Sequence, residues 1–162
     1  MKRLLVIRHA KSDWNSSALT DFERPLNNRG LRDAPLMGMF LKEKKYFPDF
    51  ILSSGAKRAL TTAEFISKNV GYTKNIYVKN NIYNASAEDI KNVLNEIEEK
   101  HNTVFIFGHN PGLSNLVYEI SGQWMELKTC CVVELELAVN KWNHISKDTA
   151  IFKNYYSPKN IV

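Results

Sequence analysis

Residues 1–12 read Met-Lys-Arg-Leu-Leu-Val-Ile-Arg-His-Ala-Lys-Ser, and the rest of the chain is organised around this stretch. The apolar run at residues 4–7 is typical of a strand that is buried on both faces of a parallel sheet. It ends abruptly at Arg8 and His9, and burying an unpaired charge costs free energy. We therefore expect the strand to end in a crevice, where open α/β sheets bind their ligands. Taken alone, this stretch fits a strand end that meets solvent about equally well.

The composition is that of one ordinary globular domain that spans residues 1–162. With 44% apolar and 24% charged residues, the chain is long enough to bury a single core. No apolar run reaches the ~20 residues that cross a bilayer. The amino terminus lacks the apolar stretch and cleavage site of a signal peptide. We therefore expect a cytoplasmic protein that does not bind membranes.

The net charge of +5 and the pI of about 9.1 indicate a preference for anionic ligands. The lysines are scattered rather than gathered in blocks, which favours a small acidic ligand over nucleic acid. The two cysteines, Cys130 and Cys131, are adjacent, so a disulfide framework is excluded. No Cys/His spacing typical of a structural zinc site occurs.

Helical periodicity predicts four helices, and short apolar runs predict five strands after the first one. The helices are expected to begin near Asn27 or Asn28, Arg58, Ser86 and Gly112, and the strands to cover residues 50–52, 74–82, 103–107, 131–139 and 151–152. Pro35 interrupts the first helical pattern, so we expect its regular part to begin late. Residues 13–29 lack an apolar period, and a connection of this length is often functional.

Strands and helices alternate along the chain until the last two strands. This order predicts an α/β fold with three layers, in which helices cover both faces of a mostly parallel sheet. An antiparallel strand is expected at one edge. Because parallel strands end at the same edge of a sheet, residues that follow different strands can meet there.

Three predicted strands are followed by residues that bind oxyanions. Arg8 and His9 follow the first strand, Arg58 follows the second, and His109 follows the strand at residues 103–107. Together they predict an electropositive pocket for a tetrahedral oxyanion, above all phosphate. His9 directly follows a rigid strand, and cationic neighbours disfavour its protonation. We therefore expect it to be a nucleophile that attacks phosphorus.

The motifs around these residues resemble those of the histidine phosphatase superfamily, also called phosphoglycerate mutase-like. They are Arg8-His9-Ala10, Ser54 with Arg58-Ala59 and Thr62-Ala63, and Gly108-His109-Asn110-Pro111. The small size and the segment Arg24-Pro25-Leu26…Arg29-Gly30 resemble the short SixA-type branch of phosphohistidine phosphatases. The resemblance extends from the first strand to the helix after His109, and it implies the phosphoglycerate mutase-like form of the predicted fold.

The resemblance implies a phosphatase in which His9 is transiently phosphorylated and water then releases inorganic phosphate. Arg8, Arg58 and His109 match positions of the phosphate pocket in the family. Neither a metal nor an organic cofactor is implied. The expected partner is a phosphorylated protein, in particular one that carries phosphohistidine, or a small phosphorylated metabolite.

Further substrate-binding residues are expected in the segment after the first strand. Arg24 matches a basic position of the short branch and could reach the phosphate or the rest of the substrate. Ser12 and Asn15 are weaker candidates, and Trp14 could shape the mouth of the pocket.

One departure from the family concerns the proton donor. Many members place a glutamate after the third strand, whereas residues 81–88 read Asn-Ile-Tyr-Asn-Ala-Ser-Ala-Glu. Glu88 and Asp89 are candidates, but acidic residues are also favoured in the first turn of a helix. Without a strong acid, an alkyl phosphomonoester is a poorer substrate than phosphohistidine or an aryl phosphate, because an alkoxide leaving group needs a proton.

Three other functions stay open at this point. A phosphoglycerate mutase-like enzyme or a metabolite-specific phosphomonoesterase would use the same pocket, although the short chain and the missing glutamate argue against it. A low-activity module could bind phosphate without turnover, which the complete arginine–histidine set argues against. A basic protein could also bind nucleic acid with a steep dependence on salt.

Overall fold

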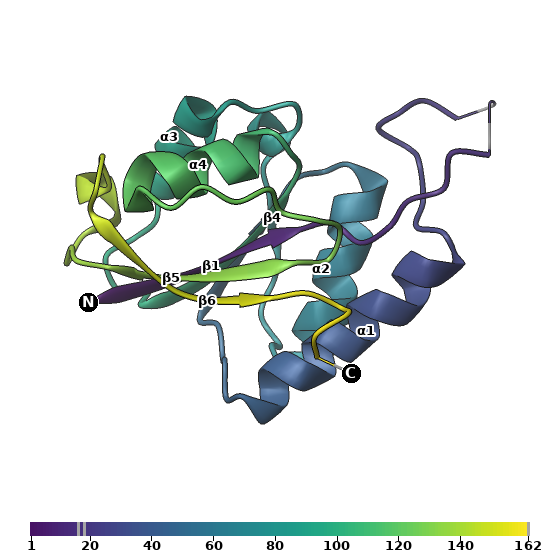
Figure 1. The fold of residues 1–162 in the computed structure, drawn as a ribbon, viewed down its shortest axis with the longest axis horizontal. Coiled ribbons are helices and arrows are strands. Elements are labelled where there is room, and N and C mark those ends of the chain that lie inside the picture. The colour runs from purple at the N-terminus through teal and green to yellow at the C-terminus, as the bar shows by residue number, and fades with distance from the viewer. Residues whose placement is uncertain (16, 18, 162) are drawn as a thin grey trace.

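Among the described residues, six strands form one central sheet (Figure 1). In sheet order they are β3 (Tyr77–Val78), β2 (Phe50–Ser53), β4 (Thr103–Gly108), β1 (Lys2–Arg8), β5 (Val132–Leu137) and β6 (Ala150–Tyr156). The computed structural model describes residues 1–15, 17 and 19–161. The strands β1 to β4 run parallel, whereas β5 pairs antiparallel with both β1 and β6. The predicted, mostly parallel sheet is confirmed, and its reversed strand β5 lies one position in from the edge.

In the described part of the chain, four α-helices cover the two faces of this sheet. The helices α1 (Asn28–Glu43) and α2 (Lys57–Val70) pack on one face, and α3 (Ala87–Asn95) and α4 (Gly112–Ser121) on the other (Figure 1). Side chains alternate along β1, so that Leu4 and Val6 face α3 and α4 while Leu5 and Ile7 face α1 and α2. All four are fully buried, which confirms a strand buried on both faces.

The helix α1 begins at Asn28, earlier than Pro35 suggested. The side chain of Asn27 accepts a hydrogen bond from the Gly30 amide at 2.9 Å and caps the first turn. A Cβ at Gly30 would lie 2.2 Å from the Lys11 backbone oxygen, so this turn packs directly on the segment after β1. The expectation of a late start is therefore wrong. Pro35 removes one backbone donor from the helix, and the cap and the close packing compensate for it.

The strand predicted at residues 74–82 is much shorter in the structure. Only Tyr77 and Val78 pair with β2, and Asn80–Ile82 forms a 3-10 turn. Both strand residues are exposed, so no buried face supports a longer strand. After the Lys79 amide bonds to the Ser53 carbonyl at 2.8 Å, the chain turns inward and buries Ile82. At the opposite edge, β6 is longer than the predicted strand at residues 151–152.

Within residues 1–15, 17 and 19–161, no helix is long and apolar enough to cross a bilayer. The same residues contain no group of three or more His, Cys, Asp or Glu side chains that could hold a metal ion. Cys130 and Cys131 are free, buried thiols.

Candidate active site

His9 lies one residue beyond β1 and is held by β4 on one side and by the segment just before β5 on the other. Its amide donates to the Gly108 carbonyl at 3.1 Å, and its carbonyl accepts from the Cys130 amide at 3.0 Å. The ring nitrogen Nδ1 lies 2.7 Å from the Ala10 carbonyl oxygen. A carbonyl only accepts hydrogen bonds, so Nδ1 carries the ring proton and Nε2 keeps its lone pair. The fold thus leaves Nε2 as the ring nitrogen with a free lone pair.

Burial is the largest cause that lowers the pKa of His9, to about 3. The bond to the Ala10 carbonyl opposes this shift, whereas the nearby His109, Arg58 and Arg8 add to it in smaller measure. The imidazole is therefore neutral at physiological pH. The cationic neighbours that the sequence indicated act in the expected direction, but they are the lesser cause.

Arg58, in the first turn of α2, is tied to the segment that carries His9. The Thr62 hydroxyl donates to the Arg58 carbonyl at 2.7 Å and accepts from the Ala10 amide at 3.0 Å. The buried Thr62 side chain thus links α2, which carries Arg58, to Ala10, the residue after His9.

His109 follows β4, and its ring lies beside the His9 ring, with ring centroids 5.3 Å apart. Its Nε2 lies 2.8 Å from the Ser54 hydroxyl oxygen, which also accepts from the Ala56 amide at 3.1 Å. With one lone pair used in this way, the hydroxyl can donate its proton to Nε2. In the tautomer that accepts this proton, Nδ1 of the neutral imidazole carries the ring proton and is a donor. Burial also lowers the pKa of His109, to about 4, with a smaller contribution from Arg58.

Arg8, the last residue of β1, is anchored by the chain that follows α4. Its Nη1 donates to the Leu127 carbonyl at 2.9 Å, and the Asn110 side-chain amide donates to the same oxygen at 2.7 Å. This fixes the guanidinium at the carboxyl edge of the sheet.

Three buried nitrogens around His9 have no hydrogen-bond partner among the described residues. They are Nε of Arg8, Nε of Arg58 and Nδ1 of His109. A buried donor without a partner costs free energy, and here three different elements each contribute one beside the same imidazole. Guanidinium and imidazole N–H groups are the donors that bind phosphoryl oxygens. The arrangement fits a tetrahedral oxyanion placed for attack by Nε2.

Arg24 reaches this pocket through Asp21. The Asp21 carboxylate accepts from Nη2 of Arg24 and from Nη2 of Arg58, both at 3.1 Å, and its backbone oxygen accepts from Nη1 of Arg58 at 2.7 Å. Arg24 is buried, bonds to the Ser12 hydroxyl and lies 3.5 Å from the centroid of the exposed Trp14 ring. Residues 21–24 therefore lie against Arg58 and Ser12, at the edge of the cluster that contains His9.

Two predicted site residues lie apart from this cluster. Asn15 is exposed and lines a cavity of about 350 Å³ beside Ser12 and Trp14. Glu88, in the first turn of α3, is exposed and forms an ion pair with Lys91 at 2.9 Å. Among the described residues, neither side chain bonds to Arg8, His9, Arg58 or His109.

Sequence reasoning missed the residues that hold the cluster together. Ser54 and Thr62 belong to the quoted motifs, but no role was derived for them. Asp21 and Tyr83 were not singled out, although the Tyr83 hydroxyl donates to the Asp21 carboxylate. Their only sequence signal is position, since Asp21 lies three residues before Arg24 and Tyr83 lies within the segment 81–88, where the family resemblance leads us to expect a glutamate.

Comparisons with known proteins agree with this geometry. Residues 4–82 match the family described as the histidine phosphatase superfamily (branch 1). An uncharacterised chloroplastic protein of Arabidopsis thaliana is 30% identical over 150 residues, which cover 87% of this chain and 69% of that protein. The chain belongs to the histidine phosphatase superfamily. The membership indicated by the motifs is confirmed.

Two solved structures share the fold. The protein histidine phosphatase SixA in complex with tungstate superposes with a TM-score of 0.86, at 21% identity and over 99% of both chains. A structure described as SixA from Agrobacterium tumefaciens gives a TM-score of 0.83, at 22% identity and over 97% of this chain and 98% of that one. The predicted phosphoglycerate mutase-like fold of the short SixA type is thus confirmed.

Proposed function

We propose that this member of the superfamily is a phosphatase that works through phosphorylation of His9. The Nε2 lone pair forms a bond to phosphorus while the bond to the leaving group breaks. Water then attacks the phosphorylated imidazole, the bond between phosphorus and Nε2 breaks, and inorganic phosphate leaves. The lone pair on Nε2 returns at the end of the cycle.

The observation that carries this proposal is the set of three buried, unpartnered donors beside His9. Donors from Arg8, Arg58 and His109 would stabilise the negative charge on the equatorial phosphoryl oxygens in the transition state. Because two guanidinium groups supply the charge neutralisation, we expect the reaction to proceed without a metal or an organic cofactor. Arg24, with Ser12 beside it, would bind a further part of the substrate, and Asn15 would contribute from the rim.

We propose phosphohistidine in a protein as the substrate, with a small phosphorylated metabolite as the alternative. The exposed Trp14 at the rim leaves the entrance open to a large partner. The likeness to SixA supports the same substrate class, and nucleic acid is not an expected partner. The cytoplasmic location expected from the sequence stays a prediction.

Phosphate release and acid-labile labelling of the protein test the mechanism together. His9→Ala should abolish both, whereas His144→Ala, at an exposed histidine, should retain them. Arg58→Ala should cost about 2–4 kcal/mol of transition-state stabilisation, and Arg32→Ala, at an exposed arginine of α1, should cost nothing measurable. Unchanged turnover in the His9 variant would exclude the mechanism.

A panel of phosphohistidine peptides, sugar phosphates, nucleotides and phosphoglycerates separates the candidate substrates. We expect the highest kcat/KM for the phosphohistidine peptides. Transfer between positions of phosphoglycerate would instead indicate a mutase. Tight phosphate binding without turnover of any compound would indicate a binding module.

A further inference from the structure

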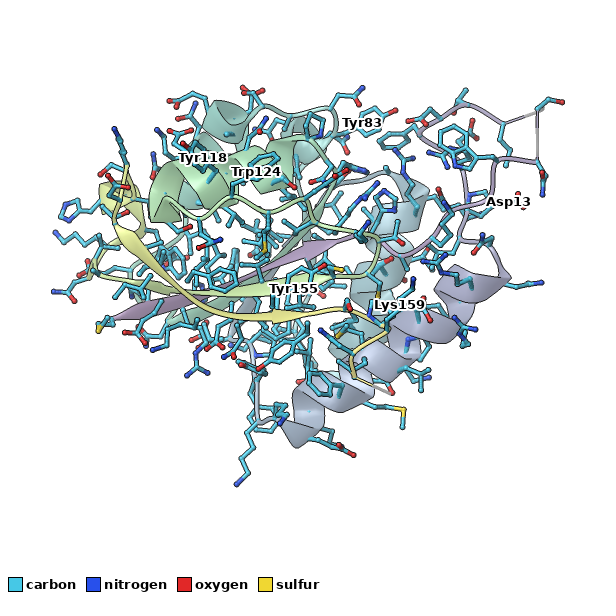
Figure 2. All side chains as sticks on the ribbon, in the orientation of Figure 1. Asp13, Tyr83, Tyr118, Trp124, Tyr155 and Lys159 are labelled. Atoms are coloured by element: carbon cyan, nitrogen blue, oxygen red, sulfur yellow. The ribbon has the colours of Figure 1, made fainter. Side chains whose placement is uncertain are left out.

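Tyr83 lies against the phosphate pocket in the segment that follows β3. Its ring meets the His109 ring edge to face, with centroids 5.5 Å apart and planes at 80°. It packs in the same way on Phe22 at 5.0 Å, and the guanidinium carbon of Arg58 lies 6.0 Å from its centroid. Figure 2 shows Tyr83 toward the end of the molecule that carries Asp13, whereas Tyr118 lies over α4.

The backbone around Tyr83 is held in place by close packing. The Tyr83 amide donates to the Asn80 carbonyl at 3.0 Å, which closes the 3-10 turn. A Cβ at Gly112 would lie 2.3 Å from the Ala85 carbonyl oxygen, so the start of α4 touches this segment directly. The phenol therefore stands at a defined place beside His109.

The Tyr83 hydroxyl holds a proton at the pocket wall. It donates to Oδ2 of Asp21, the same oxygen that accepts from Nη2 of Arg58. This bond from Tyr83 is the largest cause that lowers the pKa of Asp21, to about 2, so the carboxylate is ionised and cannot supply a proton. The same bond raises the pKa of Tyr83, which keeps the phenol protonated at neutral pH.

We propose that Tyr83 is the proton donor for the leaving group, in the place that a carboxylic acid takes in other enzymes. This inference rests on the proposed phosphatase function. As Nε2 of His9 bonds to phosphorus, the bond from phosphorus to the leaving nitrogen or oxygen breaks and its electron pair stays on that atom. The hydroxyl turns about its C–O bond from Asp21 to this atom and transfers its proton.

The second half of the cycle restores the phenol. The phenolate stands beside the Arg58 guanidinium, whose charge stabilises it. As water attacks the phosphorylated His9, the phenolate takes a proton from the water and Nε2 regains its lone pair. Protons and electrons balance over the two steps, and no further reactant is needed.

This assignment also narrows the substrate class. A phenol is a weaker acid than a carboxylic acid, so it assists leaving groups that are more basic than itself, such as imidazolide and alkoxide. It assists a weakly basic leaving group such as nitrophenolate least. The site would therefore release basic leaving groups with a phenol, rather than a carboxylic acid, as the proton donor.

A series of phosphates with leaving groups of increasing basicity tests the role. The series runs from p-nitrophenyl phosphate through less acidic phenols to alkyl phosphates, because phosphorylated imidazole can also take its proton on the other ring nitrogen. In Tyr83→Phe, the loss of kcat/KM should be smallest for the nitrophenyl ester and should increase with basicity, up to ~10²–10⁴-fold. Tyr118→Phe, at an exposed tyrosine of α4, is the matched control and should follow the wild type throughout.

Several outcomes would overturn the proposal. A uniform loss across the series would make Tyr83 a support for Asp21 and Arg58, and no loss would remove it from the reaction. A graded loss in Glu88→Gln but not in Tyr83→Phe would assign the proton to Glu88. Inhibition by vanadate checks that the pocket of Tyr83→Phe is intact. Wild-type turnover in His9→Ala would instead overturn the proposed function itself.

Discussion

Acidification from about pH 7.5 to about pH 5 should destabilise the protein through two buried histidines. His9 and His109 are 6% and 8% exposed, and burial is the main reason that their pKa values fall to about 3 and about 4. In the unfolded chain both pKa values are about 6.5. Between the folded and unfolded values, the unfolded state binds more protons than the folded state. The free energy of unfolding therefore decreases as the pH falls through this window.

The size of the effect follows from the distance between pH 5 and the unfolded pKa. That distance is about 1.5 pH units, and each unit corresponds to about 1.36 kcal/mol, which gives about 2 kcal/mol for each histidine. Both folded pKa values lie below pH 5, so the two residues contribute about equally. Together they should remove about 4 kcal/mol, a large share of the stability of a typical domain.

Unfolding in guanidinium chloride at the two pH values measures this loss. The buffer must contain no phosphate, because an oxyanion that binds the folded state would raise its stability. His9→Asn and His109→Asn should each lose about 2 kcal/mol less than the wild type on acidification. His144→Asn, at an exposed histidine, should lose as much as the wild type. Comparing pH-dependent losses cancels the change in packing that each substitution introduces.

An equal loss of stability on acidification in His9→Asn and in the wild type would refute this account of the buried histidines. If His9→Asn loses as much stability as the wild type, the folded protein does not keep His9 neutral by burial. The lone pair on Nε2 would then need another explanation, and the same argument for His109 would fall with it.

Three substitutions test other contacts of the structure. Thr62→Val leaves the buried Ala10 amide without its acceptor. We expect the free energy of unfolding, measured in denaturant, to decrease by about 1–3 kcal/mol, and kcat to decrease as well. Tyr46→Phe removes a donor from the buried Glu134 carboxylate on β5. It should lower the free energy of unfolding by a similar amount, seen as a lower denaturation midpoint, while turnover stays at the wild-type level. Gly112→Ala places a Cβ 2.3 Å from a backbone oxygen, and calorimetry should show a lower Tm that corresponds to about 1–3 kcal/mol. A wild-type kcat for Thr62→Val, a loss of turnover in Tyr46→Phe or an unchanged Tm for Gly112→Ala would contradict the respective contact.

The order of strands and helices could be predicted because it depends on local patterns. The apolar run of β1 is fully buried, as a strand between two helical layers must be. Placing Arg8, His9, Arg58 and His109 at one edge also needed only the alternation of elements, since parallel strands that share a direction share an edge. The types of these residues and their positions after predicted strands were sufficient to predict that they lie at one edge of the sheet.

The walls of the pocket could not be predicted in this way, because loops without periodicity carry them. Asp21 joins Arg24 to Arg58 through a turn that no local pattern specifies. Tyr83 follows a short turn that replaces the end of the strand predicted at residues 74–82, and the chain turns there because it leaves the sheet edge to bury Ile82. Such contacts depend on the packing of distant segments.

By itself, then, the sequence determined the fold class and the edge of the sheet at which Arg8, His9, Arg58 and His109 lie. Those features follow from hydrophobic periodicity and from the chemistry of residues at strand ends. Only the tertiary structure decided which nitrogen of His9 is free, which buried nitrogens of the described residues have no partner, and that Tyr83 stands beside His109 and Arg58. Hydrogen bonds and burial decide these points, and both arise only when segments far apart in the chain come together.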